Sequence, residues 1–307
     1  MPTHSRPRSI AIAGLLALSV PAIALGVAFG HGRTAIEPRA AVADPRGSAQ
    51  LPLGGTRIFP HYRVVALYGA PGTDRLGILG IGPEAAAAKL LVKAHTYAKG
   101  RKPVLPAFEL IATVASSHPG DGGLYRIRQN PAVIQQYLDT ARDLKALLVL
   151  DIQPGRADFL SEVKALEPFL RMPDVGLALD PEWHVGPGAV PGQVLGSVDA
   201  ATVNSVIRYL SGLVEQNGLP EKLLIVHQFT SHMVEQRGMV RPTPQVAVTF
   251  DVDGVGGQDG KTAKYLEFAS DPRFHYGIKL YLHQDVDLMK PLDVINLYPS
   301  PDLVVYQ

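Results

Sequence analysis

The chain has 307 residues, of which 46% are hydrophobic and 19% charged, and its formal net charge at pH 7 is +1. This is an ordinary globular composition, and the balanced charge gives no reason to expect a nucleic acid partner or an anionic membrane surface. Because the chain has no cysteine, disulfides, thiolate metal sites, a cysteine nucleophile and a lipid anchor on cysteine are excluded.

The N-terminal residues have the pattern of an export signal. Arg6 and Arg8 precede an uncharged, mainly apolar run over residues 9–30, and small residues follow it. This order is typical of a secretory signal peptide, and the run is also close to the ~20 residues that span a membrane. We therefore expect residues 1–32 to be a signal peptide or an uncleaved N-terminal anchor. Both alternatives predict a secreted or extracytoplasmic protein that meets the membrane only through this helix.

Residues 33–56 are rich in Gly, Ala, Pro and Arg and show no apolar periodicity, so we expect a flexible linker there. Between residues 57 and 307, short apolar runs alternate with segments of helical pattern, which predicts one folded domain. The apolar runs cover residues 64–68, 108–114, 147–153, 175–182, 223–228, 246–253, 277–283 and 303–306. They are rich in Val, Ile, Leu and Phe, as buried parallel strands are.

The segments between these runs read as helices. The helical patterns cover residues 84–99, 131–145, 157–170 and 199–218, and more weakly 261–269 and 287–297. Strands that alternate with helices predict an α/β fold with a parallel sheet, and eight strands favour closure into a (β/α)8 TIM-type barrel. No helical pattern follows the eighth run, so the last helix is expected to be missing or replaced by an N-terminal segment, with residues 51–62 as the candidate. An open doubly wound sheet is the alternative.

Polar residues recur at every second position near the ends of several expected strands. The pairs are Asp151 with Gln153, Asp180 with Glu182, Asp251 with Asp253, and Tyr281 with His283, and His227 and Gln228 end a fifth strand. Side chains two apart on a strand share a face, and the active sites of barrels lie at the carboxyl ends of their strands. These residues are therefore expected to converge on a site. Glu109 and Lys279 lie deeper in their strands, where a structural role in the barrel interior is the competing interpretation.

The segment around Asp180 and Glu182 suggests a two-carboxylate mechanism. Hydrolysis of a glycosidic bond needs one carboxyl as general acid and a second as nucleophile or base. Glu182 is the candidate acid, because a neighbouring carboxylate and an apolar ring raise the pKa of a carboxyl. Asp180 or Asp251, or alternatively Asp151, is the candidate partner.

The remaining residues of this set are expected to bind substrate. A ring such as that of Trp183, the only tryptophan of the chain, can stack on the C–H face of a sugar. The candidate substrate-binding residues are Asp151, Gln153, Trp183, His184, His227, Gln228, Asp253, Tyr281 and His283. The expected partner is a polysaccharide or a cell-wall glycan.

With the acidic pair Asp180 and Glu182 at the end of its fourth strand, the sequence resembles glycoside-hydrolase-like (β/α)8 barrels over most of residues 60–307. The stretches 150–156, 179–184 and 226–229 are also similar to an uncharacterised exported actinobacterial protein family, which implies a cell-envelope setting. The chain departs from the commonest glycosidase pattern, because Lys279, Tyr281 and His283 stand where a second Glu is usual on strand seven. This departure moves the expected partner of Glu182 to Asp251 or Asp180.

Two alternatives remain open from the sequence. No cofactor is expected for a glycosidase, but a divalent metal is the alternative cofactor, because Asp and Glu oxygens and His nitrogens are good metal ligands. The candidate ligands are Asp180, Glu182, His184, His227, Asp251, Asp253 and His283. Such a site would make the protein a metal-dependent hydrolase of the cell envelope. The second alternative is a non-catalytic barrel that binds glycan.

Overall fold

The computed structural model describes residues 49–307, and their central feature is a closed barrel of parallel strands. The barrel strands are β1 (Arg63–Gly69), β2 (Val104–Ala115), β4 (Leu147–Ile152), β5 (Val175–Leu179), β7 (Lys222–Gln228), β9 (Val246–Val252), β10 (His275–Leu280) and β11 (Leu303–Tyr306). Neighbouring strands pair in parallel, and β1 pairs with both β2 and β11, which closes the ring. The predicted TIM-type barrel is confirmed, and all eight predicted runs form its strands.

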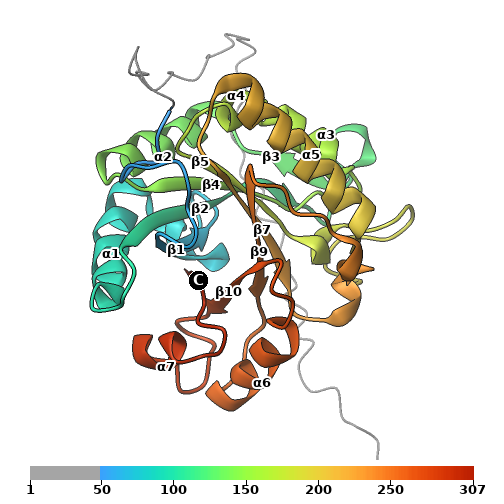
Figure 1. Ribbon diagram of the computed structural model, residues 1–307. Helices are drawn as coiled ribbons and strands as arrows, with labels where there is room; N and C mark the ends of the chain where they lie inside the picture. The colour runs from blue at the N-terminus through green and yellow to red at the C-terminus, as the bar shows by residue number, and fades with distance from the viewer. Residues whose placement is uncertain (1–48) are drawn as a thin grey trace, which may run out of the picture.

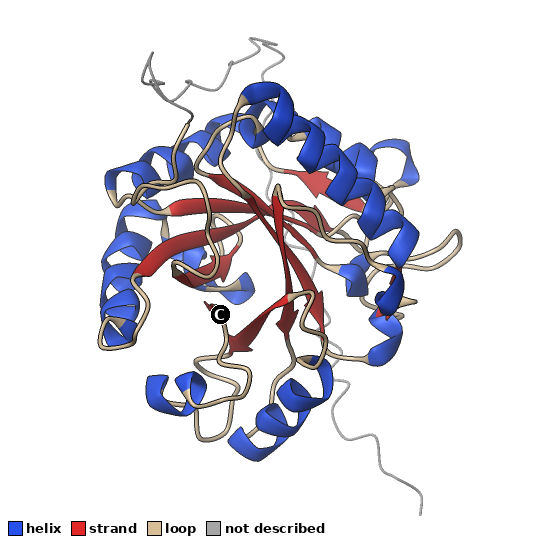
Figure 2. Ribbon diagram, in the orientation of Figure 1, coloured by secondary structure: helices blue, strands red, loops and turns tan. Residues whose placement is uncertain are grey.

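Helices surround the barrel, as Figures 1 and 2 show. They are α1 (Pro83–Tyr97), α2 (Pro131–Asp143), α3 (Phe159–Ala165), α4 (Glu167–Leu170), α5 (Ala200–Asn217), α6 (Gln258–Phe268) and α7 (Pro291–Ile295). Their caps follow from the sequence: the Asn130, Asp158 and Asp199 side chains each accept a hydrogen bond from a backbone N–H of the first turn. Side chains alternate along each strand between the barrel interior and its outer face, so every second residue contacts these helices.

Two hydrophobic cores result from this alternation. Outward residues such as Val65 and Leu67 of β1 join the core beneath the helices, whereas Val64 and Ala66 join the core inside the barrel. The interior core fills the lower part of the barrel with residues such as Leu223. Nearer the carboxyl ends of the strands, the inward positions carry charged side chains instead. The barrel is therefore apolar at its floor and polar at its mouth.

No eighth helix follows β11 within the described residues, as the sequence predicts, and α7 and α1 are neighbours in the ring (Figure 1). Helix α1 covers the outer face of β11: the Tyr97 hydroxyl lies 2.7 Å from that of Tyr306, and the Lys93 ammonium lies 4.4 Å from the centre of the Tyr306 ring. The last strand is thus protected by a helix from the other end of the chain.

The N-terminal segment 51–62 packs under the barrel, across the starts of the strands. Leu51, Ile58 and Phe59 are buried and belong to the interior core. The Glu221 carboxylate accepts a hydrogen bond of 2.7 Å from the backbone N–H of Ile58, and its own backbone N–H donates to the Thr56 carbonyl. Residues 51–56, the end of the predicted linker, are therefore packed in the folded domain. Residues 51–62, the candidate replacement for the eighth helix, therefore form the floor of the barrel, where they cover the starts of the strands.

Three smaller strands were not predicted. Strand β3 (Arg126–Arg128) pairs antiparallel with the end of β2, and β6 (Val198–Asp199) pairs with β8 (Val234–Glu235). Glu162 fixes β3 against α3, because its buried carboxylate forms ion pairs with Arg126 at 3.0 Å and Arg128 at 2.7 Å. These short strands lie in the loops that follow the carboxyl ends of β2, β5 and β7.

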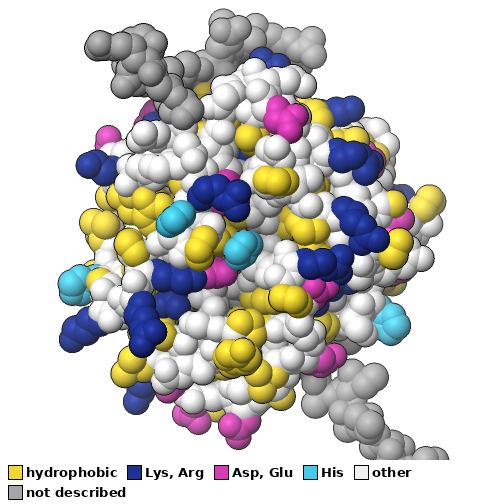
Figure 3. Space-filling model, viewed as in Figure 1, with side chains coloured by type: hydrophobic (Ala, Val, Ile, Leu, Met, Phe, Trp, Pro, Cys, Tyr) yellow, Lys and Arg dark blue, Asp and Glu magenta, His cyan; other side chains and the backbone are white. Residues whose placement is uncertain are grey.

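No helix within residues 49–307 is long and apolar enough to cross a membrane. The expected signal peptide or anchor at residues 1–32, and most of the expected linker, lie outside the described residues. On the face seen in Figure 3, basic side chains are spread among hydrophobic and acidic ones.

Candidate active site

His227 lies at the centre of a polar network inside the barrel. On β7, Leu223, Ile225 and His227 lie on the inward face, so the His227 imidazole follows two interior core residues along the same strand. The His227 Nε2 atom lies 2.8 Å from an oxygen of Glu109 on β2, and Nδ1 lies 3.3 Å from an oxygen of Asp251 on β9. All three side chains are 0% exposed, so the imidazole links two walls of the barrel out of contact with water.

Lys279 on β10 neutralises Asp253 on the same side of the barrel. The Lys279 ammonium lies 3.2 Å from Asp253 Oδ2 and 3.7 Å from the centre of the Tyr68 ring. The Tyr281 hydroxyl donates to Asp253 Oδ1 at 2.5 Å. Burial acts to raise the pKa of Asp253, but Lys279, His227 and Tyr281 outweigh it and hold this pKa well below its usual value. Asp253 is therefore ionised at neutral pH.

Asp180 is held by two donors through one of its oxygens. The Tyr68 hydroxyl donates to Asp180 Oδ2 at 3.1 Å, and the Gln153 side-chain amide donates to the same atom at 3.2 Å. Gln153 is itself oriented, because its carbonyl accepts a hydrogen bond of 3.1 Å from the Ala115 backbone N–H. Asp180 Oδ1 is buried without a hydrogen-bond partner. Asp180 thus presents one oxygen that is free to act.

Glu182 stands at the mouth of the network, in a short 3-10 turn (Pro181–Trp183) that directly follows β5. Its side chain is partly exposed, but Oε2 is buried and has no hydrogen-bond partner. Burial raises the pKa of Glu182 well above its usual value, and the Asp180 and Asp253 carboxylates raise it further, against the opposing effect of His227 and Lys279. The group is therefore protonated at a pH where ordinary glutamates are ionised, which is the state that a general acid needs.

Asp151 and Asp251 are the most enclosed acids of the network. Both are 0% exposed, and none of their four carboxylate oxygens has a hydrogen-bond partner. Burial and the neighbouring Asp180 raise the pKa of Asp151 well above its usual value. Burial also raises the pKa of Asp251 to about 6, although His227 opposes this. The interior holds more acidic groups than Lys279 and His227 can neutralise.

The structure brings together most of the predicted site residues. Those within the network are Asp151, Gln153, Asp180, Glu182, His227, Asp251, Asp253 and Tyr281. Their predicted convergence follows from the two-residue spacing, because each pair continues the inward face of its strand.

Four predicted residues lie elsewhere. His184 Nδ1 lies 2.7 Å from the Ser197 carbonyl, and its ring packs 5.3 Å from that of Phe159, toward the helices. The Gln228 amide donates to the Thr230 carbonyl at 3.2 Å. Trp183 is partly exposed and lies beside Gly192 of the following loop, and His283 is exposed in the turn after β10. Within residues 49–307 no hydrogen bond or ion pair joins these side chains to the network, and the predicted metal-ligand set that includes His184 and His283 is not assembled.

Three network residues were underrated or missed from the sequence. The sequence leaves a structural role open for Glu109 and Lys279, and in the structure both pair directly with site residues. The sequence places Tyr68 only within an apolar run. Its place as the third inward residue of β1, after Val64 and Ala66, was the available signal, because that position lies level with the mouth of the barrel.

A subset of the network has the composition of a metal site. One ligand atom each from Glu109, Asp151 and His227 lie within 4.8 Å of one another. Two cavities of about 290 Å³ lie elsewhere, one beside α1 lined by Leu67 and Val92, the other at the floor lined by Arg57 and Glu221. Neither cavity contains a residue of the network. Within the network, Glu182 and Tyr281 are partly exposed and the other residues are buried.

Comparison with known proteins gives similarity of structure only. No protein-family model matches the chain, and no curated protein matches its sequence. Among solved structures, a hyperthermophilic endo-β-1,4-glucanase in complex with substrate is 8% identical with a TM-score of 0.34, over 66% of this chain and 76% of that one.

Two further structures match about half of their own length. An HPPK-DHPS in complex with substrates is 11% identical with a TM-score of 0.37, over 80% of this chain and 48% of that one. A maltogenic α-amylase from Thermotoga neapolitana is 10% identical with a TM-score of 0.25, over 81% of this chain and 50% of that one. At these scores the matches carry no argument about activity, and the barrel of this chain is established by its own strand pairing.

Proposed function

We propose that the protein is a hydrolase that cleaves glycosidic bonds, with Glu182 as its general acid. The supporting observation is the state of this one carboxyl, which lies at the solvent-facing mouth of the network with its pKa raised by burial, Asp180 and Asp253. A protonated carboxyl in this position can give its proton to the oxygen of a leaving sugar. The same group, once ionised, can take a proton from the incoming water.

Asp180 is the better of the two proposed partners. Its Oδ2 is fixed by Tyr68 and Gln153, which leaves Oδ1 to attack the anomeric carbon or to activate a water molecule. Asp251 lies deeper, with both oxygens enclosed and 3.3 Å from His227. Asp180 also precedes Glu182 by only two residues, so both reacting groups lie at the mouth of the barrel.

Polar groups near the mouth would bind the sugar. The Tyr281 hydroxyl already donates to Asp253 and the Gln153 amide donates to Asp180, and Gln153, Asp253 and Tyr281 can form further hydrogen bonds with sugar hydroxyl groups. Trp183 would stack on a sugar ring from the loop side. That loop, residues 184–197, is rich in glycine and proline and lies over the carboxyl end of β5. Its displacement would open the network to a polysaccharide or a cell-wall glycan.

The proposed place of action is outside the cytoplasmic membrane, because the N-terminal sequence has the pattern of an export signal or anchor. Fractionation of the native host tests this proposal. Protein found in the medium or the envelope fraction, and degraded by protease added to intact cells, is the expected result. Full-length protein confined to the cytosol would contradict it.

Sugar release from a panel of cell-wall and plant polysaccharides tests the activity. Glu182→Gln keeps the shape but cannot donate the proton, so kcat is expected to fall about 10²–10⁴-fold while glycan binding is retained. The matched control is Glu267→Gln, an exposed carboxyl on α6, which should leave kcat unchanged. Cleavage that survives in Glu182→Gln would sink the assignment. Binding without any cleavage by the unaltered protein would instead support a glycan-binding barrel.

A further inference from the structure

The negative charge inside the barrel is neutralised on one side only. Lys279 on β10 lies 3.2 Å from Asp253, which directly follows β9. Glu109 on β2 and Asp151 on β4 form no ion pair with a lysine or arginine anywhere in residues 49–307, and Glu109 meets only the imidazole of His227. Two carboxylates in a water-free interior cost several kcal/mol unless a positive charge offsets them. The β2–β4 side of the interior lacks that charge.

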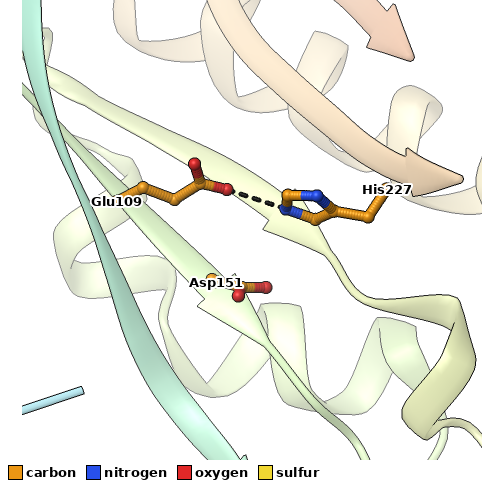
Figure 4. Close-up of side chains that lie close together, drawn as sticks. All are labelled: Glu109, Asp151 and His227. Carbon is orange, nitrogen blue, oxygen red and sulfur yellow. Dashed lines mark hydrogen bonds and ion pairs between the residues drawn. The ribbon is translucent and has the colours of Figure 1, made fainter. Parts of the chain in front are cut away.

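Unpaired oxygens mark the place where the charge is missing. Both oxygens of Asp151 and Oε2 of Glu109 are buried without a hydrogen-bond partner, on side chains that are 0% exposed. Figure 4 shows Glu109 and His227 reaching toward each other from different strands, with the Asp151 carboxylate directed into the space beside them. Buried polar atoms are nearly always bonded, so a group of orphaned oxygens around one space indicates an absent ligand.

We propose that Glu109, Asp151 and His227 bind a divalent transition-metal ion. One ligand atom from each residue lies within 4.8 Å of the others. Metal–ligand bonds of about 2.0–2.2 Å allow two ligand atoms to lie up to about 4.4 Å apart. The site therefore closes on an ion through a shift of a few tenths of an ångström, which side-chain rotation supplies. The ion adds positive charge on the side of the interior where Glu109 and Asp151 have no lysine or arginine partner.

Asp251 prepares His227 for this role. Its Oδ2 lies 3.3 Å from His227 Nδ1, so a small approach lets it accept the Nδ1 proton and leaves the lone pair of Nε2 for a metal. A carboxylate behind the far nitrogen is the usual support of a metal-binding histidine. Asp180 Oδ1, which has no hydrogen-bond partner and lies 3.6 Å from Nε2, borders the same space from the mouth.

The ligand set selects the class of ion. One imidazole nitrogen and two carboxylate oxygens suit Zn²⁺, Mn²⁺ or Fe²⁺, whereas Ca²⁺ and Mg²⁺ prefer oxygen alone. This inference does not rest on the proposed glycosidase activity. A metal that supports the interior and a carboxylate mechanism at the mouth are compatible, and metal binding is measured without substrate.

The test is direct titration of tag-free, chelator-treated protein with Zn²⁺ and with Mn²⁺, followed by calorimetry and by elemental analysis after dialysis. We expect one ion per chain and a rise in the melting temperature. Mg²⁺ and Ca²⁺ are expected to bind more weakly by at least about tenfold. Absence of saturable binding of either transition metal would overturn the proposal.

Variants locate the site. Asp151→Asn is expected to abolish the stoichiometric binding, and Asp251→Asn to weaken it by about 10–100-fold. The matched control is Asp302→Asn at the opposite end of the barrel, another carboxylate paired with a histidine, at 2.8 Å from His275 Nδ1, which should bind as the unaltered protein does. Circular dichroism verifies that each variant is folded. If Asp151→Asn proves unfolded, Glu109→Gln serves in its place, and unchanged binding in a folded variant of either ligand would show that the ion binds elsewhere.

Discussion

Asp251 shows how burial ties the stability of the protein to pH. Burial raises the pKa of this carboxyl to about 6, so the folded protein keeps its proton to a higher pH than the unfolded chain, whose value is about 3.9. Such a group stabilises the fold fully below the unfolded pKa, and this contribution is lost as the pH rises through about 6. Asp253, whose pKa is lowered, has the opposite effect, and its contribution is lost as the pH falls in the acid range.

From this difference we predict the behaviour of Asp251→Asn. Between pH 4 and pH 7 the raised pKa of Asp251 removes about 2 kcal/mol from the free energy of unfolding of the metal-free protein, and an amide, which does not titrate, cannot contribute this loss. Urea unfolding at both pH values, in both proteins, measures it. The variant should therefore lose less stability over this interval than the unaltered chain. An equal loss in the two proteins would mean that Asp251 does not titrate there.

At the residue scale, the sequence predicts which side chains face inward but not how they pair. Asp180, Asp251 and Asp253 could be assigned because each continues a two-residue spacing into the end of its strand. Glu109 could not be assigned to the site, because its height in the barrel depends on the stagger between β2 and β7. Stagger is a property of the closed ring and leaves no signal within one strand.

At the scale of elements, Gly277 shows why β10 has no side chain at one inward position. A Cβ atom there would lie 2.5 Å from Asp251 Oδ1 and 2.9 Å from Leu303 Cδ2, closer than atoms pack. Strand β10 pairs Gly277 directly with Asp251 of β9, so the missing side chain makes room for the buried carboxylate. The buried carboxylate of Asp251 therefore depends on the absence of a side chain at Gly277.

Gly277→Ala is therefore expected to lower the free energy of unfolding by about 1–3 kcal/mol, the usual cost of an added methyl group in a full core. Gly260→Ala is the matched control. Gly260 lies in α6 with no atom near its missing Cβ, and alanine is the better helix former by up to about 1 kcal/mol, so this variant should be neutral or stabilised. Thermal unfolding compares the two. Equal behaviour of both variants would show that the interior has room to spare.

Elements with strong local signals were predicted, and those that depend on partners were not. The helix predicted over residues 157–170 is divided into α3 and α4, because Pro168 has no N–H to bond back to the preceding turn. Strands β3, β6 and β8 have two or three residues each and are held mainly by what they pair with. No apolar periodicity is visible in segments that short.

At the scale of the whole molecule, the floor makes the N-terminal segment part of the domain. Phe59 is 1% exposed, and its ring packs 4.5 Å from that of His275 at the start of β10. The predicted domain start at residue 57 missed Leu51, which is buried in the interior core. The contact between residues 51–59 and strands more than 160 positions away has no local pattern, so composition alone suggested a linker.

We predict that Phe59→Ala lowers the free energy of unfolding by about 3–5 kcal/mol, as expected for the loss of a buried aromatic ring. Leu53→Ala, at a position that is 40% exposed in the same segment, should change it by no more than about 0.5 kcal/mol. Denaturant titration of both variants measures the difference. A small effect at Phe59 would mean that the floor is dispensable and that the segment merely rests on the barrel.

The pairing of β1 with β11 also determines when a newly made chain can close its barrel. A polypeptide that leaves the ribosome, or threads through a translocation channel, with its N-terminus first releases β1 long before residues 303–306. Until residues 303–306 have emerged and formed β11, β1 and β10 each have an edge without a partner strand, and the acidic side chains of the interior stay hydrated and ionised. The stage that dehydrates these acids therefore follows the release of β11, and the barrel of a chain that still lacks this strand stays open.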